Sequence, residues 1–242
     1  EKQTKSKGSE PSKSQEQQKK ERKKERQMDT TKIAVVTGGT RGIGYEITKG
    51  LAKLKDFRVV FTARSTESGE KAVARLLDEG IHACKVSFFV VDVTEEGGPQ
   101  KIANHVLDKF GTVHVLVNNA GVFLDGESNV ADVSLDIIRR SFEVNTLAPL
   151  RFIQAFLPIF KSENYGRIVN VSSVQGSLKH MRSKYTGYRV SKSALNCVTR
   201  MIADEVKDFN ILVNSMCPGA CKTDMSESIN FPTSRTAEQG AD

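Results

Sequence analysis

The chain lacks any long hydrophobic run. None of its apolar stretches approaches the roughly twenty residues that a membrane-spanning helix needs, and its N-terminus has no apolar segment like that of a secretory signal. Cysteine is also scarce: the four cysteines form no CxxC pair, and no histidines cluster near them. The spacing therefore predicts no metal site, and we expect a cytoplasmic protein with reduced cysteines.

Excess charge of one sign is confined to the N-terminal segment. The 242 residues have a formal net charge of +7, and residues 1–28 hold ten of the 36 Lys and Arg but only five of the 29 Asp and Glu. This segment has no apolar face to bury, so the sequence predicts a disordered charged tail over 1–28 and a folded domain over 29–242. The domain is nearly neutral. Nucleic-acid binding would have to use the tail and is the least favoured function.

Short β-branched runs alternate with longer segments of helical period after the tail. This alternation predicts a single doubly wound Rossmann domain of the α/β class, with a parallel sheet of six strands and helices on both faces. The expected strands are Ile33–Thr37, Arg58–Phe61, Val86–Val91, His114–Asn118, Arg167–Ser172 and Ile211–Ser215. The expected helices are Ile43–Lys55, Thr66–Glu79, Pro99–Phe110, Ser134–Phe160 and Tyr188–Asp208.

A glycine-rich turn follows the first expected strand and opens the first helix. In a Rossmann fold the pyrophosphate of a dinucleotide binds here, because glycine lets the backbone approach closely and the helix N-terminus offers free N–H groups. The expected cofactor-binding residues of this turn are Gly38, Thr40, Arg41, Gly42, Ile43 and Gly44. The alternative is a tight connection without a ligand.

The second expected strand ends at Arg64 without a carboxylate. An acidic residue at this place binds the ribose 2′-OH of NAD, whereas arginine binds the 2′-phosphate of NADP. Arg41 and Arg64 therefore favour NADPH, unless both are ordinary surface arginines.

Three later segments are expected at the carboxyl edge of the sheet, where doubly wound folds bind ligands. Asp92 either accepts a hydrogen bond from the adenine amino group or caps the following turn. Thr223 bonds the nicotinamide carboxamide or a phosphate, unless its segment is simply a loop. The expected cofactor-binding residues here are Asp92, Val93, Asn119, Ala120, Gly121, Pro218, Gly219 and Thr223.

Tyr188 and Lys192 are four residues apart on an expected helix, so they share one face. A free tyrosine has a pKa near 10, and a neighbouring ammonium lowers this pKa and suits the phenol to proton transfer. Ser173, after the fifth strand, is expected to polarise a carbonyl oxygen. Tyr45 and Lys49 repeat the spacing without an upstream serine pair, and we interpret that second pair as structural.

These motifs together resemble the short-chain dehydrogenases/reductases. The resemblance covers essentially everything from Lys32 to the end, through TGxxxGxG at 37–44, NNAG at 118–121, Asn145, Ser173, YxxxK at 188–192 and Pro218-Gly219. Residues 211–225 and 236–241 are most similar to the NADPH-dependent carbonyl reductases and their plant menthone and salutaridine reductase relatives.

The resemblance implies a catalytic set of four residues. Tyr188 is the acid, Lys192 holds the nicotinamide ribose and lowers the tyrosine pKa, Ser173 orients the substrate, and Asn145 anchors a proton-relay water. Tyr188 and Lys192 thus also bind the cofactor. Family members continue through a further helix and a seventh strand, so we expect that strand to be missing at the C-terminus. Only fourteen residues separate Ser173 from Tyr188, without the long insertion of these carbonyl reductases, so a dimer or tetramer stays open.

The sequence thus predicts an NADPH-dependent oxidoreductase that reduces a ketone, aldehyde or quinone carbonyl to the alcohol. An NAD(P)-linked alcohol dehydrogenase and a non-catalytic NADP-binding scaffold or sensor are the alternatives. The partner is a small-molecule carbonyl substrate whose identity does not follow from the sequence.

Overall fold

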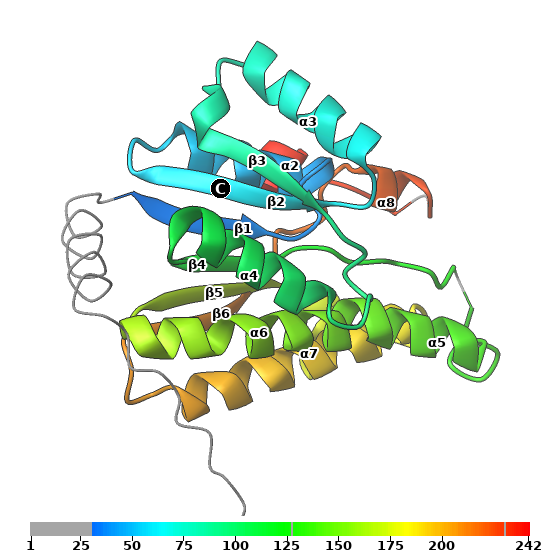
Figure 1. Ribbon diagram of the computed structural model, residues 1–242. Coiled ribbons are helices and arrows are strands. Elements are labelled where there is room, and N and C mark those ends of the chain that lie inside the picture. The colour runs from blue at the N-terminus through cyan, green and yellow to red at the C-terminus, as the bar shows by residue number, and fades with distance from the viewer. Residues whose placement is uncertain (1–30, 127, 230) are drawn as a thin grey trace, which may run out of the picture. The chain divides into compact units, whose positions relative to one another are not determined.

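The computed structural model describes residues 31–126, 128–229 and 231–242, so the charged tail expected over 1–28 lies outside the described residues. A six-stranded sheet organises residues 32–242, which form one compact unit (Figure 1). Its strands are β1 (Lys32–Val36), β2 (Phe57–Ala63), β3 (Val86–Val90), β4 (Val115–Asn118), β5 (Gly166–Val171) and β6 (Ile211–Met216). All neighbours are parallel, in the order β3-β2-β1-β4-β5-β6. This Rossmann order confirms the predicted fold class.

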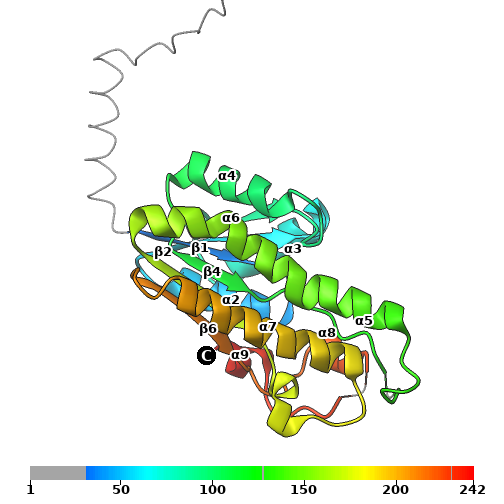
Figure 2. The same cartoon turned by 90° about the horizontal axis from the view of Figure 1, so that it is seen from below.

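Helices cover both faces of the sheet, as Figures 1 and 2 show. Helices α4, α6 and α7 lie on one side, and α2 and α3 lie on the other. The described helices are α2 (Gly42–Lys53), α3 (Thr66–Asp78), α4 (Gly98–Phe110), α5 (Leu135–Phe142), α6 (Ala148–Glu163), α7 (Thr186–Glu205), α8 (Asp224–Glu227) and α9 (Ala237–Ala241). The sequence pattern does not predict α8 and α9, because four or five residues are too few to show a helical period.

Strand β1 shows how the core is divided. Ile33 and Val35 pack with residues of α4, α6 and α7, whereas Ala34 and Val36 pack with residues of α2 and α3. Successive side chains of a strand point to opposite faces, so a central parallel strand that is buried on both sides is hydrophobic throughout. The continuous apolar run of β1 therefore places it in the middle of the sheet.

The segment expected as one long helix, Ser134–Phe160, is interrupted. Between α5 and α6 lies a π-helical turn, Glu143–Leu147, in which the Ala148 N–H donates to the Glu143 carbonyl. Pro149 follows at the start of α6 and has no N–H to donate. Such turns occur frequently at functional sites, and this one carries Asn145.

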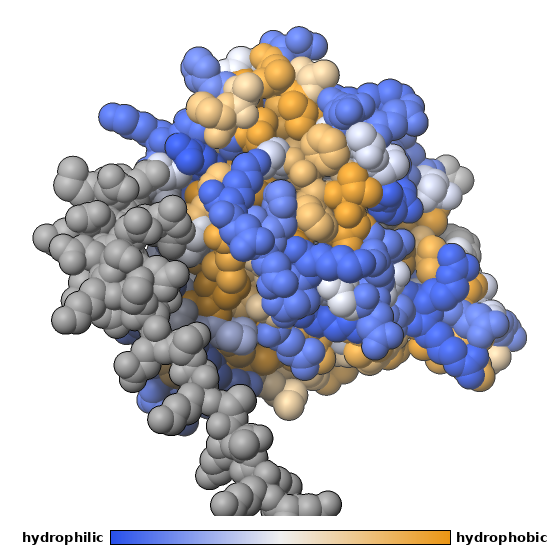
Figure 3. Space-filling view, viewed as in Figure 1, coloured by the Kyte–Doolittle hydropathy of each residue, from blue (hydrophilic) through white to orange (hydrophobic). Residues whose placement is uncertain are grey.

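Strand β3 forms one edge of the sheet. Figure 3 shows hydrophobic residues at the surface along this strand, beside the hydrophilic surface of α4, and Val90 is 43% exposed.

Of the helices in the described part of the chain, none is long and apolar enough to cross a membrane. All four cysteines are free.

We expect Phe156→Ala to lower the free energy of unfolding by about 3–5 kcal/mol. Phe156 lies on α6, is fully buried and contacts the rings of Phe152 and Phe160, so its removal leaves a cavity. Met201→Ala on α7, which removes a side chain that is 70% exposed, should change this free energy by less than about 0.5 kcal/mol. Urea unfolding of both variants measures the difference, and equal losses would contradict this assignment of the core.

Candidate active site

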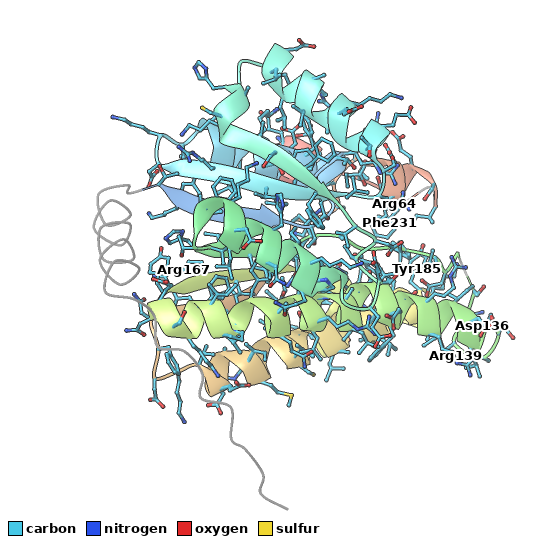
Figure 4. All side chains as sticks on the ribbon, viewed as in Figure 1. Arg64, Asp136, Arg139, Arg167, Tyr185 and Phe231 are labelled. Carbon is cyan, nitrogen blue, oxygen red and sulfur yellow. The ribbon has the colours of Figure 1, made fainter. Side chains whose placement is uncertain are left out.

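The carboxyl ends of the strands border a cleft of about 840 Å³. Figure 4 shows Arg64, Tyr185 and Phe231 at this end of the molecule and Arg167 at the opposite end. Every residue that the sequence predicted for the site lines this cleft except Asn145, which lies buried beside it. One end of the sheet therefore brings together residues from positions 38 to 223 of the chain.

The glycine turn is shaped for a close approach of backbone to ligand. Gly38 and Gly42 have φ values of 67° and 55°, a region that side chains disfavour. A Cβ atom on Gly44 would lie 2.2 Å from Asn119 Nδ2 and 2.3 Å from the Gly38 oxygen. The Asn119 amide donates to the carbonyls of Thr37 and Gly38 at 2.9 and 3.2 Å. The turn thus fits a dinucleotide, since the glycines of the turn and the N-terminus of α2 line the cleft.

The charged groups near the turn are partly paired. Arg41 Nη1 donates to Asp224 Oδ2 at 2.8 Å, with both side chains about two-thirds exposed. Arg64 is exposed and lines the same cleft. Asp92 accepts from the Thr94 hydroxyl at 2.6 Å and from its N–H at 2.8 Å, which lowers the pKa of the carboxyl. Asp92 therefore caps its turn, and its contact with adenine stays a prediction.

The loop after β6 closes the cleft from the other side. Gly219 has a φ of 82°, and a Cβ there would lie 2.9 Å from Arg235 Cδ, whose guanidinium donates to the Pro218 carbonyl at 2.9 Å. Thr223 caps α8 through its hydroxyl, which accepts from the Ser226 N–H. Its hydroxyl is therefore engaged within the chain, and its predicted bond to the cofactor stays untested.

Ser173, Tyr188 and Lys192 meet in the cleft. Ser173 and Tyr188 both line the cleft, and the Ser173 side chain is near enough to the phenol to affect its pKa. Lys192 Nζ lies 5.8 Å from the centre of the Tyr188 ring and donates to the Val171 carbonyl at 2.7 Å. Lys192 is only 4% exposed, so a single backbone carbonyl and the neighbouring ring hold this amine in place.

Burial has the largest effect on the pKa values of Tyr188 and Lys192. Burial raises the pKa of Tyr188 to about 12; the Ser173 side chain lowers this pKa in part, and the nearby Cys217 and Asp125 raise it further. Burial also lowers the pKa of Lys192 to about 8. The lowering that we expected for the tyrosine is thus outweighed by the loss of water around the phenol. A phenol of this pKa is protonated at neutral pH and so carries a proton to donate, but it is a weaker acid than a free tyrosine.

Asn145 is held behind the reacting groups by the π-helical turn. Its Oδ1 accepts from the Val122 N–H at 2.8 Å, and its Nδ2 donates to the Val122 carbonyl at 2.9 Å and to Ser191 Oγ at 3.0 Å. A Cβ on Gly121 would lie 3.1 Å from Asn145 Oδ1 and 3.5 Å from Lys192 Nζ. The amide oxygen of Asn145 and the ammonium of Lys192 therefore both lie close to Gly121, in the loop after β4.

Asp125 is a residue that the sequence analysis missed. It is fully buried, and its carboxylate accepts from the N–H groups of Gly187 at 2.7 Å and Tyr188 at 3.2 Å. The residue at the N-cap of α7, Tyr185, offers no capping side chain, so Asp125 supplies the acceptor from another part of the chain. The helix that carries Tyr188 is thereby tied to the loop after β4.

The second Tyr-Lys pair lies outside the cleft. Tyr45 is 1% exposed and donates to Glu79 at 3.1 Å. Lys49 pairs with Glu46 at 2.5 Å and with Glu79 at 3.1 Å. These contacts join α2 to the end of α3, which agrees with the structural interpretation of this pair.

Known proteins are similar to this chain in sequence and in fold. The family model described as short chain dehydrogenase matches residues 32–233. The chain is 32% identical to an Arabidopsis thaliana (+)-neomenthol dehydrogenase, over 88% of this chain and 90% of that protein. It is 29% identical to rat carbonyl reductase [NADPH] 3, over 88% of each. The structure of salutaridine reductase from Papaver somniferum superimposes with a TM-score of 0.73 at 27% identity, over 87% of this chain and 92% of that one.

The chain therefore belongs to the short-chain dehydrogenase family. It is an oxidoreductase of a family that binds a nicotinamide cofactor, NAD or NADP, and acts on small molecules. The resemblance inferred from the motifs is confirmed.

We expect Asp125→Ala to lower the free energy of unfolding by about 1–3 kcal/mol, because it leaves two buried N–H groups of α7 without an acceptor. Asp125→Asn keeps one carbonyl oxygen, so its free energy of unfolding should lie between those of Asp125→Ala and the unaltered protein. Asp136→Ala removes a carboxylate that is 80% exposed and paired with Arg139, and should cost less than about 0.5 kcal/mol. Urea unfolding compares the three, and similar losses for the two alanine variants would contradict the capping role.

Proposed function

We propose that the protein is an NADPH-dependent carbonyl reductase, which reduces a ketone, aldehyde or quinone to the alcohol. The observation that carries this proposal is that Tyr188, Ser173 and the buried Lys192 line the same cleft as the glycine turn, with Lys192 Nζ 5.8 Å from the centre of the Tyr188 ring. When bound, the nicotinamide supplies the hydride.

The side chains of the site orient the carbonyl, supply the proton and hold the cofactor. The Ser173 hydroxyl orients the carbonyl by donating to its oxygen, and Tyr188 gives that oxygen a proton as negative charge develops on it. Lys192 holds the nicotinamide ribose and keeps a positive charge near the phenol. Asn145 anchors the loop after β4 and the water that returns a proton toward Tyr188. Much of the rate is gained by positioning these groups together.

The choice of NADPH rests on the arginines. Arg41 and Arg64 both line the cleft, and the second strand ends without a carboxylate that would repel a 2′-phosphate. The rat relative is named for its use of NADPH, which supports the same choice.

An NAD(P)-linked alcohol dehydrogenase is the second candidate, favoured by the name of the Arabidopsis relative. Oxidation needs the phenolate of Tyr188 as a base, and a pKa of about 12 opposes that form at neutral pH. The intact set of Asn145, Ser173, Tyr188 and Lys192 argues against a non-catalytic scaffold. The cytoplasmic location and the oligomeric state stay predictions from the sequence.

Tyr188→Phe tests the proton donor. The variant keeps the ring but loses the proton, so we expect kcat for carbonyl reduction to fall by about 10²–10⁴. The Kd of NADPH, measured by fluorescence titration, should change less than about threefold, within about 0.7 kcal/mol.

Tyr45→Phe is the matched control, because Tyr45 belongs to the second pair with the same spacing. It removes the hydroxyl bonded to Glu79 and should cost stability, by about 0.5–1.5 kcal/mol, but leave kcat unchanged. Substantial turnover by Tyr188→Phe would refute the assignment of the acid.

Replacing Arg41 or Arg64 by alanine tests the cofactor. Hydrogen bonds to a charged group contribute about 1.5–3 kcal/mol, so each change should raise the Kd of NADPH by roughly 10- to 100-fold and leave NADH binding nearly unaltered. Arg139→Ala, which removes an exposed arginine of α5, is the control. A preference of the unaltered protein for NADH would overturn the choice of NADPH.

A further inference from the structure

The cleft beyond Tyr188 has an aromatic wall. The Phe123 ring stacks on the Tyr188 ring, with centroids 4.1 Å apart and planes 5° from parallel. The Phe231 centroid lies 6.1 Å from that of Phe123, and both rings line the cleft. Phe123 comes from the loop after β4 and Phe231 from the segment after α8, so segments 108 residues apart build one surface beside the reacting hydroxyl.

Tyr185 supports this wall from behind. Its ring makes edge contacts with Phe123 at 5.1 Å and with Phe231 at 6.0 Å. Figure 4 shows Tyr185 and Phe231 at the same end of the molecule. Tyr185 has a φ of 62°, a conformation that costs free energy for a residue with a side chain and that tends to cluster at ligand sites. The strained backbone directs this ring toward the other two.

Contacts from α7 hold the strained residue in place. Arg189 is 5% exposed, and its guanidinium donates to the carbonyls of Lys184 at 2.7 Å and His180 at 2.8 Å. The same guanidinium lies 5.9 Å from the Tyr185 ring. Several parts of the chain therefore build the wall. A chance packing of rings would require neither a strained backbone at Tyr185 nor the buried Arg189 beside it.

Where they line the cleft, the loops after β4 and β5 and the segment after α8 carry no charged side chain. The lining side chains near the wall include Val122, Phe123 and Leu124 after β4, Ser173 and Gln175 after β5, Met225 of α8, and Ser228 and Phe231 after α8. Charged side chains, among them Arg140, Glu143 and Asp224, line the cleft from other elements. A carboxylate or phosphate of a substrate that lies against the wall itself would lose its hydration without gaining a charged partner from these loops. Flat apolar rings gain from contact with aromatic faces and edges instead.

We propose that Phe123, Phe231 and the supporting Tyr185 form a substrate subsite for a flat, uncharged ring attached to the reacting carbonyl. The inference rests on the proposed function, and it names the substrate class as neutral aryl or ring-conjugated carbonyl compounds. In the reaction the carbonyl carbon accepts a hydride from NADPH, which is oxidised to NADP⁺. The carbonyl oxygen takes the proton of Tyr188, and one proton from water restores the phenol.

The test compares kcat/KM for two ketones that share a carbon skeleton, acetophenone with its flat ring and cyclohexyl methyl ketone with its puckered one. The unaltered protein should prefer acetophenone roughly tenfold, and Phe231→Leu and Phe123→Leu should each reduce this ratio severalfold. A ratio of rate constants does not depend on the fraction of folded enzyme. Phe209→Leu, which alters a half-exposed ring beside Lys161 near the end of α7, is the control and should leave the ratio unchanged.

Benzoylformate has a carboxylate in place of the methyl group of acetophenone, and it tests whether the wall lacks a charged partner. Its kcat/KM should be at least tenfold lower than that of acetophenone. Reduction of both neutral ketones without preference, an unchanged ratio in Phe231→Leu, or a better rate with benzoylformate would overturn the subsite and leave the proposed function standing. Failure to reduce acetophenone, cyclohexyl methyl ketone and butanal with bound NADPH would overturn the proposed function and the subsite with it.

Discussion

The site depends on one buried carboxylate. Asp125 accepts hydrogen bonds from the N–H groups of Gly187 and Tyr188 and so joins the loop after β4 to α7, the helix that carries Tyr188. The same loop begins with Asn119, which holds the glycine turn, and is bonded at Val122 by Asn145. A single stretch of irregular backbone thus sets the distance between the glycine turn and Tyr188. Loops usually carry function in this way when a rigid sheet supports them.

The fold followed from the sequence because its signals are local. The buried strands read as apolar runs, and the glycine turn stands between β1 and α2, where its conformation is required. Periodicity also indicated the helices, but it did not reveal the π-helical turn at Glu143–Leu147. That turn depends on contacts of Asn145 with a backbone segment more than twenty residues away, and no local pattern encodes such a contact.

The site could be predicted only in part, because its side chains meet through contacts between residues far apart in the chain. The spacing of Tyr188 and Lys192 occurs also at Tyr45 and Lys49, and only the surroundings distinguish the two pairs. Tyr188 and Lys192 line a cleft together with Ser173, whereas Tyr45 and Lys49 bind the exposed Glu79 at the end of α3. The acidity of Tyr188 was misjudged because the sequence shows which charges are near a group but not how far water is excluded from it. Asp125 gave no signal, since it caps a helix that begins sixty residues later in the chain.

The ion pair between Arg41 and Asp224 has a kinetic consequence. An exposed pair of this kind is worth at most about 1 kcal/mol, so a cofactor phosphate that binds Arg41 as proposed would displace the carboxylate at small cost. Asp224 is the first residue of α8, which also carries Met225 and precedes Phe231, and both of these side chains line the cleft. Under the proposed function, the nucleotide would release one tie on the segment that meets the substrate, and this linkage would favour binding of the nucleotide before the substrate.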